Sequence, residues 1–123
     1  MGGINMKILV SSVGKQSTDS VDPRFGRGDY FQIFDTEARA YKAIENVGKS
    51  SDHGAGIGAS QQVIDENVDV VITGHLGPNA YNLLSESNIE TYSCNEGSVE
   101  QAINLYIENK LEKINKAGSP HRA

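Results

Sequence analysis

From residue 48 onward, helical and strand patterns alternate along the sequence. Apolar residues that recur every three or four positions predict helices, and the short apolar runs between them predict strands. The predicted helices cover 57–67, 78–87 and 99–114, and the predicted strands cover 68–73 and 89–93. Since consecutive parallel strands are joined by right-handed crossovers, the alternation predicts β-α-β steps and a parallel sheet covered by helices.

The last predicted helix has the clearest signals. Ser98 stands three residues before Gln101, which is the spacing of a capping box. An apolar face follows at helical spacing and is expected to be buried. Its members are Val99, Ile103, Tyr106, Ile107 and Ile114.

The first half of the chain has a different pattern. Residues 6–12 predict a buried strand, and 29–35 and 40–46 predict a β-hairpin. The loop 13–28 between them exceeds the usual length of connections in compact domains, which is typical of functional or mobile loops. Its Ser, Thr, Asp and Gly content predicts that it is disordered without a ligand.

These elements predict an α/β fold with three layers, α/β/α, around a five-stranded mixed sheet whose second strand is antiparallel to the others. The carboxyl ends of strands one, three, four and five then reach the same edge. Ligands of open α/β sheets bind at that edge. The loops leaving it are 12–28, 47–56, 74–77 and 94–97.

Two of these loops place glycines directly before a predicted helix. His53-Gly54-Ala55-Gly56 precedes the first helix, and Gly74-His75-Leu76-Gly77 precedes Pro78, a favourable first helical residue. Glycine leaves backbone N–H groups accessible, and a helix start adds further unpaired ones. Both loops therefore predict close approach of the backbone to an anionic ligand, involving Gly54, Gly56, Gly74 and Gly77.

Charge and cysteine content exclude several classes of protein. Eleven basic and 16 acidic residues give a net charge of −5, which argues against nucleic-acid binding. A single cysteine, Cys94, allows no internal disulfide, and no apolar run approaches the ~20 residues that span a bilayer. These features predict a cytoplasmic protein without membrane or nucleic-acid partners.

One domain is expected over 6–114. Residues 1–5 lack the pattern of a signal peptide and are interpreted as an extension or an expression remnant. Residues 115–123 have few groups to pack and are predicted to form a flexible tail in which His121 is incidental.

Four motifs together resemble a known family. They are Arg24-Phe25-Gly26-Arg27, His53-Gly54-Ala55-Gly56, Val70-Val71-Ile72-Thr73-Gly74 and Gly77-Pro78-Asn79-Ala80. In this order and spacing they are similar to the dinitrogenase iron–molybdenum cofactor biosynthesis family, in particular to the small single-domain relatives of nitrogenase accessory proteins. The resemblance extends from Met6 to about Glu112.

The resemblance implies a ribonuclease-H-like fold and a role in binding, carrying or protecting metal clusters. Relatives hold the iron–molybdenum cofactor or its precursor, and some small relatives hold other sulfide-bridged heterometal clusters. A client metalloenzyme or a cluster-assembly protein is the implied partner.

The candidate metal ligands are His53, His75 and Cys94, because imidazole and thiolate are the ligands that iron and sulfide clusters accept. With one thiol, the chain is expected to receive a preassembled cluster through one to three ligands. The other interpretation stays open: the histidines are hydrogen-bonded loop residues, and Cys94 is a small buried apolar residue.

Arg24 and Arg27 flank Phe25 and Gly26 in the long loop. Both guanidinium groups are candidates to clamp an anionic cluster by charge-assisted hydrogen bonds. Alternatively, they form ion pairs with Asp22 and Asp29 and fix the loop, while Phe25 fills the core.

Catalytic patterns are weak. Gly54, Gly56 and Ala59 match a relaxed dinucleotide fingerprint, but they follow a hairpin strand and no acidic residue ends the next strand. Gly48-Lys49-Ser50 lacks the first glycine of a phosphate loop. The first strand carries no carboxylate for the magnesium ions of a nuclease or phosphotransferase.

The sequence therefore predicts a non-enzymatic carrier of an anionic iron–sulfur, iron–molybdenum or other heterometal cluster. Two alternatives remain. One is a metal-free regulatory module that binds a small anion or an acidic partner segment, and the other is a diverged phosphoryl-transfer enzyme.

Overall fold

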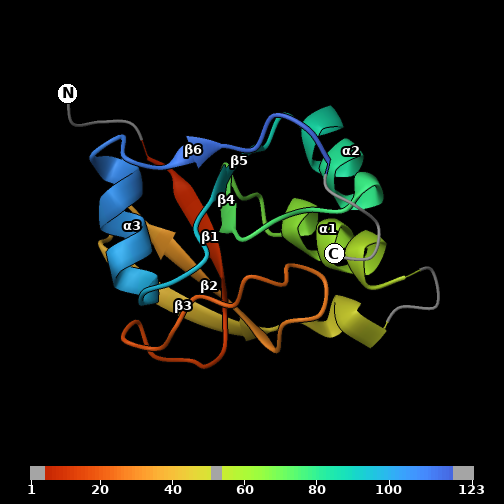
Figure 1. Cartoon of the computed structure of the whole chain (residues 1–123). Coiled ribbons are helices and arrows are strands. Elements are labelled where there is room, and N and C mark those ends of the chain that lie inside the picture. Colours follow the sequence, from red (N-terminus) through yellow and green to blue (C-terminus); the bar gives the residue numbers. More distant parts are fainter. Residues whose placement is uncertain (1–4, 51–53, 118–123) are drawn as a thin grey trace.

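The computed structural model describes residues 5–50 and 54–117, which form one mixed sheet with helices on both faces (Figure 1). Strands and helices alternate as expected in the second half of the chain. The elements are β1 (Lys7–Ser12), β2 (Tyr30–Asp35), β3 (Ala40–Glu45), the short 3₁₀ helix η1 (Val47–Ser50), α1 (Ala55–Asp65), β4 (Val70–Thr73), α2 (Pro78–Glu86), β5 (Glu90–Ser93), α3 (Val99–Ile107) and β6 (Glu112–Lys113).

Over the described residues the sheet has six strands in the order β3-β2-β1-β4-β5-β6. Strands β1, β4 and β5 are mutually parallel, whereas β2 is antiparallel to both β1 and β3. This confirms the mixed sheet with an antiparallel second strand. The predicted number of five strands is wrong, because β6 pairs antiparallel with β5.

The sixth strand arises where the sequence predicts the end of the last helix. Helix α3 stops at Ile107 instead of residue 114, because Asn109 adopts a left-handed conformation (φ 60°). The Lys110 N–H then bonds the Leu105 carbonyl at 2.9 Å, the closing bond of a Schellman motif. As a result Ile107 is 56% exposed, and Ile114 packs on the opposite side of the sheet from α3.

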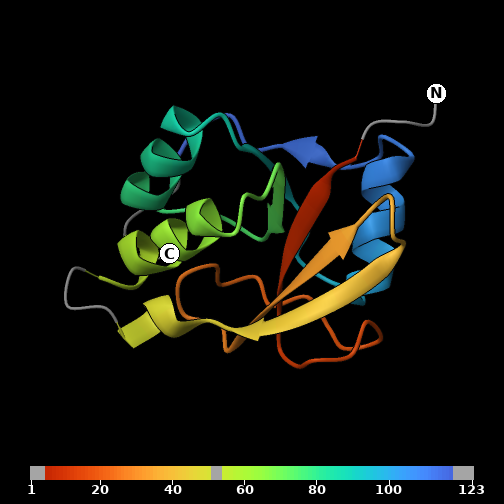
Figure 2. The same cartoon turned by 180° about the vertical axis from the view of Figure 1, so that it is seen from behind.

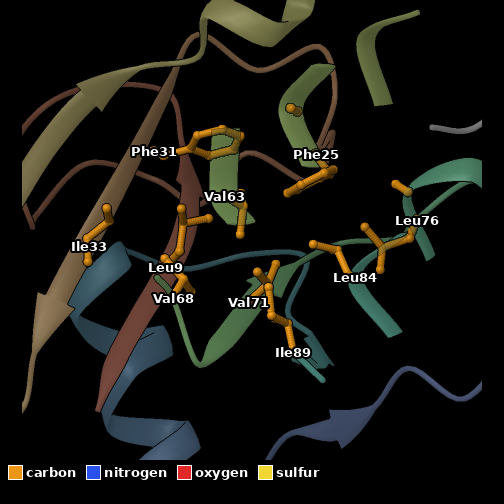
Figure 3. Close-up of a cluster of buried hydrophobic side chains, with 12 residues drawn as sticks. Leu9, Phe25, Phe31, Ile33, Val63, Val68, Val71, Leu76, Leu84 and Ile89 are labelled. Carbon is orange, nitrogen blue, oxygen red and sulfur yellow. The ribbon is translucent and has the colours of Figure 1, made fainter. Parts of the chain in front are cut away.

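Two hydrophobic clusters lie on the two faces of the sheet, so the three-layer arrangement is confirmed (Figures 1 and 2). One cluster, here called the α1–α2 cluster, packs between the sheet and helices α1 and α2, and the other, the α3 cluster, packs between the sheet and α3. Because side chains alternate along a strand, Leu9 of β1 belongs to the α1–α2 cluster, while Ile8 and Val10 belong to the α3 cluster. Figure 3 shows Phe25 and Leu76, from two separate loops, within the α1–α2 cluster. The ribonuclease-H-like designation stays a prediction.

No helix in the two described ranges is both long and apolar enough to cross a membrane. The tail prediction is only partly covered, since 118–123 lie outside the described residues. Asn115, within the predicted tail, accepts a hydrogen bond at 2.6 Å from the Tyr81 hydroxyl.

Candidate functional site

The long loop 13–28 lies along the carboxyl edge of the sheet and contacts the other loops of that edge. The Val21 N–H bonds the Gly97 carbonyl at 2.9 Å, before α3. Arg24 forms a backbone bridge with His75, before α2. Loops that are 50 or more positions apart in the chain therefore meet at one edge, as the strand order predicts.

Gly26 of the long loop lies against the start of α1. A Cβ atom at this position would lie 2.9 Å from the Gly56 nitrogen, closer than side chains normally approach backbone. The absence of a side chain therefore allows the contact.

Hydrogen bonds hold the long loop, in contrast to the predicted disorder. The buried Gln32 of β2 donates through Nε2 to the carbonyls of Gly14 and Gln16 at 2.9 and 2.8 Å. The Ser11 hydroxyl donates to the Asp22 carbonyl. Composition alone misses these contacts because their donors lie on β1 and β2.

Arg24 is committed to the structure of this loop. Its Nε and Nη2 donate to the two carboxylate oxygens of Asp22 at 3.1 and 3.0 Å, and its backbone N–H adds a third bond at 3.0 Å. Asp22 is 2% exposed, and its hydrogen bond and charge raise the pKa of Arg24. For Arg24 the structure thus favours the ion-pair interpretation over the clamp.

Arg27 instead lines an open pocket of about 160 Å³. The pocket lies where the long loop meets the starts of α1 and α2. Among the described residues Arg27 has no ion-pair partner. The pocket residues are Arg27, Gly54, Ala55, Gly56, Ile57, Gly77, Pro78, Asn79 and Ala80.

Neither helix start in this pocket has a side-chain cap within the described part of the chain. The N-cap residues are Gly54, with a φ of 106°, and Gly77, which is followed by Pro78 at the first helical position. No acidic residue occupies the first turn of either helix. The unpaired first-turn N–H groups and the positive ends of two helix dipoles therefore meet beside a guanidinium group, an arrangement that favours an anion.

The structure describes two of the three predicted metal ligands, His75 and Cys94, and neither lines this pocket. His53 lies outside the described residues. His75 is partly buried and is not among the residues lining this pocket. Within the described ranges no three His, Cys, Asp or Glu side chains are grouped so that they could hold a metal ion.

Cys94 packs in the α3 cluster, across the sheet from the pocket. Cys94 is buried, with 7% of the residue exposed, and its thiol donates to the Glu96 carbonyl at 3.3 Å. Burial raises the pKa of the thiol. These features fit the alternative in which Cys94 is a small apolar core residue.

The remaining predicted residues divide between packing and the pocket. Phe25 is 1% exposed and lies 5.5 Å from Phe31, ring centre to ring centre, so it fills the core. Gly74 is a packing position, since a Cβ there would lie 2.5 Å from Pro23 Cβ. Gly54, Gly56 and Gly77 line the pocket.

Sequence reasoning missed two buried carboxamides, Gln32 and Asn46. Each is at most 1% exposed and donates to backbone carbonyls of the long loop. The available signal was a polar residue within or directly after an apolar strand, which requires a hydrogen-bond partner when buried.

Comparisons with known proteins agree with the motifs. The family model described as dinitrogenase iron-molybdenum cofactor matches residues 6–109. An uncharacterized protein of Methanocaldococcus jannaschii is 32% identical over 97 residues, which cover 76% of this chain and 82% of that protein.

Solved structures share the fold. The apo form of the orange protein from Desulfovibrio gigas is 28% identical with a TM-score of 0.87, covering 93% of this chain and 97% of that one. A candidate NifB protein from Thermotoga is 30% identical with a TM-score of 0.82, covering 94% and 98%. The chain belongs to the dinitrogenase iron–molybdenum cofactor family.

Proposed function

We propose that this protein is a non-enzymatic carrier that binds a preassembled, anionic iron–sulfur or heterometal cluster in the pocket formed by Arg27 and the starts of α1 and α2. The observation that carries the proposal is the convergence of two helix starts without side-chain caps on one guanidinium group. Sulfide-bridged clusters of the iron–molybdenum type are anions, and such a pocket stabilises negative charge.

The mode of binding follows from the ligands that the chain offers. Cys94 is buried on the far face of the sheet, and no metal-binding group of three side chains exists among the described residues. The cargo is therefore held mainly by amide and guanidinium hydrogen bonds, and the two predicted imidazole ligands, His53 and His75, are tested by substitution below. Weak ligation suits a carrier that must release its cargo to a client metalloenzyme or a cluster-assembly protein.

Two further observations support this function. The family that matches this chain takes its description from the dinitrogenase iron–molybdenum cofactor. The orange protein was solved in an apo form, so that relative is a protein with a removable group. In this chain the end of β1 carries Ser11 and Ser12 in place of the carboxylates of a metal-dependent nuclease, which supports a binding role over catalysis.

The test is anaerobic incubation with tetrathiomolybdate or a preassembled iron–sulfur cluster, followed by gel filtration and visible spectra. The wild type is expected to elute with metal and colour. Arg27→Ala should weaken binding about ten- to a hundredfold, because charge-assisted hydrogen bonds are lost. Lys110→Ala removes the same charge from an exposed ion pair with Glu108 and should bind like the wild type. Colour that stays in the small-molecule fraction would refute the carrier.

A second function, a metal-free module for a small anion, is favoured by the pocket volume of about 160 Å³ and by the lack of a described metal-ligand group. A His53→Ala, His75→Ala double variant separates the two. Imidazole ligation predicts weaker cluster binding and a changed visible spectrum in the variant. The small-anion module predicts that phosphate or a carboxylate raises the melting temperature equally in both proteins.

A further inference from the structure

Asn46, the residue after β3, is a buried carboxamide that contacts the long loop on both sides of Arg27. Its side chain is 1% exposed, and Nδ2 lies 3.2 Å from the Gly26 carbonyl and 2.9 Å from the Gly28 carbonyl. A third carbonyl, that of Phe25, lies at 3.3 Å. The Asn46 N–H also bonds the Asp29 carbonyl at 2.9 Å.

These contacts fix the backbone that presents Arg27 to the pocket. Residues 26 and 28 are the two neighbours of Arg27 in the chain, and both have their carbonyls turned to the same amide. Gly26 in turn lies against the first turn of α1. The Asn46 side chain and the close approach of Gly26 together thus hold the Arg27 backbone against the α1 start.

Asn46 also begins the segment that leads to the other wall of the pocket. It is followed by η1, in which Gly48 lies so close to Ala59 of α1 that a Cβ would be 2.1 Å from the Ala59 nitrogen. Lys49 of η1 forms an ion pair with Asp29 of the loop. The long loop and the approach to α1 are therefore joined at Asn46.

The chemistry of this contact requires an amide. The two N–H groups of Nδ2 are shared among three carbonyl acceptors, while Oδ1 has no hydrogen-bond partner among the described residues. A carboxylate of the same shape would place negative charge against carbonyl oxygens and remove every donor.

We propose that Asn46 is a positioning residue for anion binding, acting through Arg27. The proposal rests on the proposed function, because the pocket that Arg27 lines is the one that receives the anion. It predicts that the effect of changing Asn46 on affinity disappears when Arg27 is absent.

Gln32 provides a matched control. It is a second buried carboxamide that donates to the same loop, but its partners, Ser12 Oγ and the carbonyls of Gly14 and Gln16, lie away from the pocket. Gln32→Glu makes the same chemical change as Asn46→Asp in the other half of the loop. A general loss of loop order would affect binding in both variants.

The experiment measures tetrathiomolybdate affinity for wild type, Asn46→Asp, Gln32→Glu, Arg27→Ala and the Asn46→Asp, Arg27→Ala double variant. Asn46→Asp is expected to weaken binding about tenfold alone and to have no further effect beside Arg27→Ala. Gln32→Glu should bind like the wild type. Equal losses in both carboxamide variants, or an undiminished loss in the double variant, would overturn the proposal. If Asn46→Asp does not fold, Asn46→Ser takes its place with the same expected non-additivity.

A readout without ligand separates this proposal from the proposed function. The backbone amide resonances of Gly26, Arg27 and Gly28 should shift in Asn46→Asp and keep their positions in Gln32→Glu. Failure of the wild type to bind any anion would refute the carrier, whereas unshifted resonances in Asn46→Asp would refute the positioning role.

Discussion

In the described part of the chain, helices α1, α2 and α3 begin at the same edge of the sheet, but their first turns are completed in different ways. At α3, the Ser98 hydroxyl accepts a hydrogen bond from the Gln101 N–H at 3.1 Å, and the Gln101 side chain accepts one from the Ser98 N–H at 2.8 Å. At α1 and α2 the N-cap residues are Gly54 and Gly77, and no side chain of the described residues completes either turn.

This difference coincides with the location of the pocket. The self-capped start of α3 satisfies its own donors, whereas the two glycine-capped starts leave theirs to another partner and lie together beside Arg27. Within one fold, the identity of the N-cap residue thus separates a helix start that caps itself from the two that we propose bind an anion.

The largest expected effect breaks the contact that brings Arg27 to α1. Gly26→Ala places a Cβ 2.9 Å from the Gly56 nitrogen, so the loop must move, with a loss of about 1–3 kcal/mol in the free energy of unfolding and weaker tetrathiomolybdate binding. Gly56→Ala is the control for stability, since its Cβ would lie 3.6 Å from Ala80 Cβ, an ordinary contact. Urea unfolding compares the two variants, and a binding titration compares Gly26→Ala with the wild type. Equal stability of the two variants would show that Gly26 does not set this contact.

A smaller effect is expected from removing the cap of α3. Ser98→Ala loses the hydrogen bond to Gln101 and should lower the free energy of unfolding by about 1 kcal/mol. Anion affinity should be unchanged, because α3 does not line the pocket. Thermal unfolding and the same titration test this separation. A loss of affinity comparable to that of Arg27→Ala would contradict it.

The smallest expected effect is a change in stability caused by the Cys94 thiol, in the loop before α3, and it appears only at alkaline pH. Burial raises the pKa of Cys94 above that of an unfolded thiol, so the folded state keeps its proton where the unfolded state has lost it. The free energy of unfolding is therefore unaffected below the unfolded pKa of about 8.5 and falls as pH rises through the window between the two values.

Urea unfolding of wild type and Cys94→Ser at pH 7 and about 9.5 isolates the contribution of the thiol to the pH dependence of stability, because the serine hydroxyl does not titrate in this range. The variant should lose less stability over this interval, and the wild-type thiol should react slowly with thiol reagents at pH 8. Rapid labelling of the folded protein would instead indicate an accessible ligand.

Much of the fold follows from local patterns. Runs such as Val70–Thr73 are apolar, and the alternation of helices and strands fixes which strand ends meet. The glycine-bearing helix starts were also predictable, because Gly77-Pro78 marks a helix start by backbone geometry alone. What the pattern could not give was the end of α3, where the left-handed Asn109 diverts an apolar periodicity into β6.

The roles of the two arginines could not be separated from the sequence. Arg24 and Arg27 are three residues apart and chemically identical, yet Asp22 engages one of them and the other lines the pocket. The difference depends on the path of the loop around Arg27, which is held by donors distant in the sequence such as Asn46. Likewise, the side of the sheet on which Cys94 packs depends on strand register.

The most direct test of the account is a ¹H–¹⁵N NMR titration of the wild-type protein with tetrathiomolybdate. If the anion binds at the starts of α1 and α2, the amide resonances there should shift together with one apparent affinity; these are the resonances of Ala55, Gly56, Ile57, Asn79 and Ala80. The resonances at the start of α3, those of Val99, Glu100 and Gln101, should stay in place. Shifts confined to the start of α3, or unshifted resonances at α1 and α2, would contradict it.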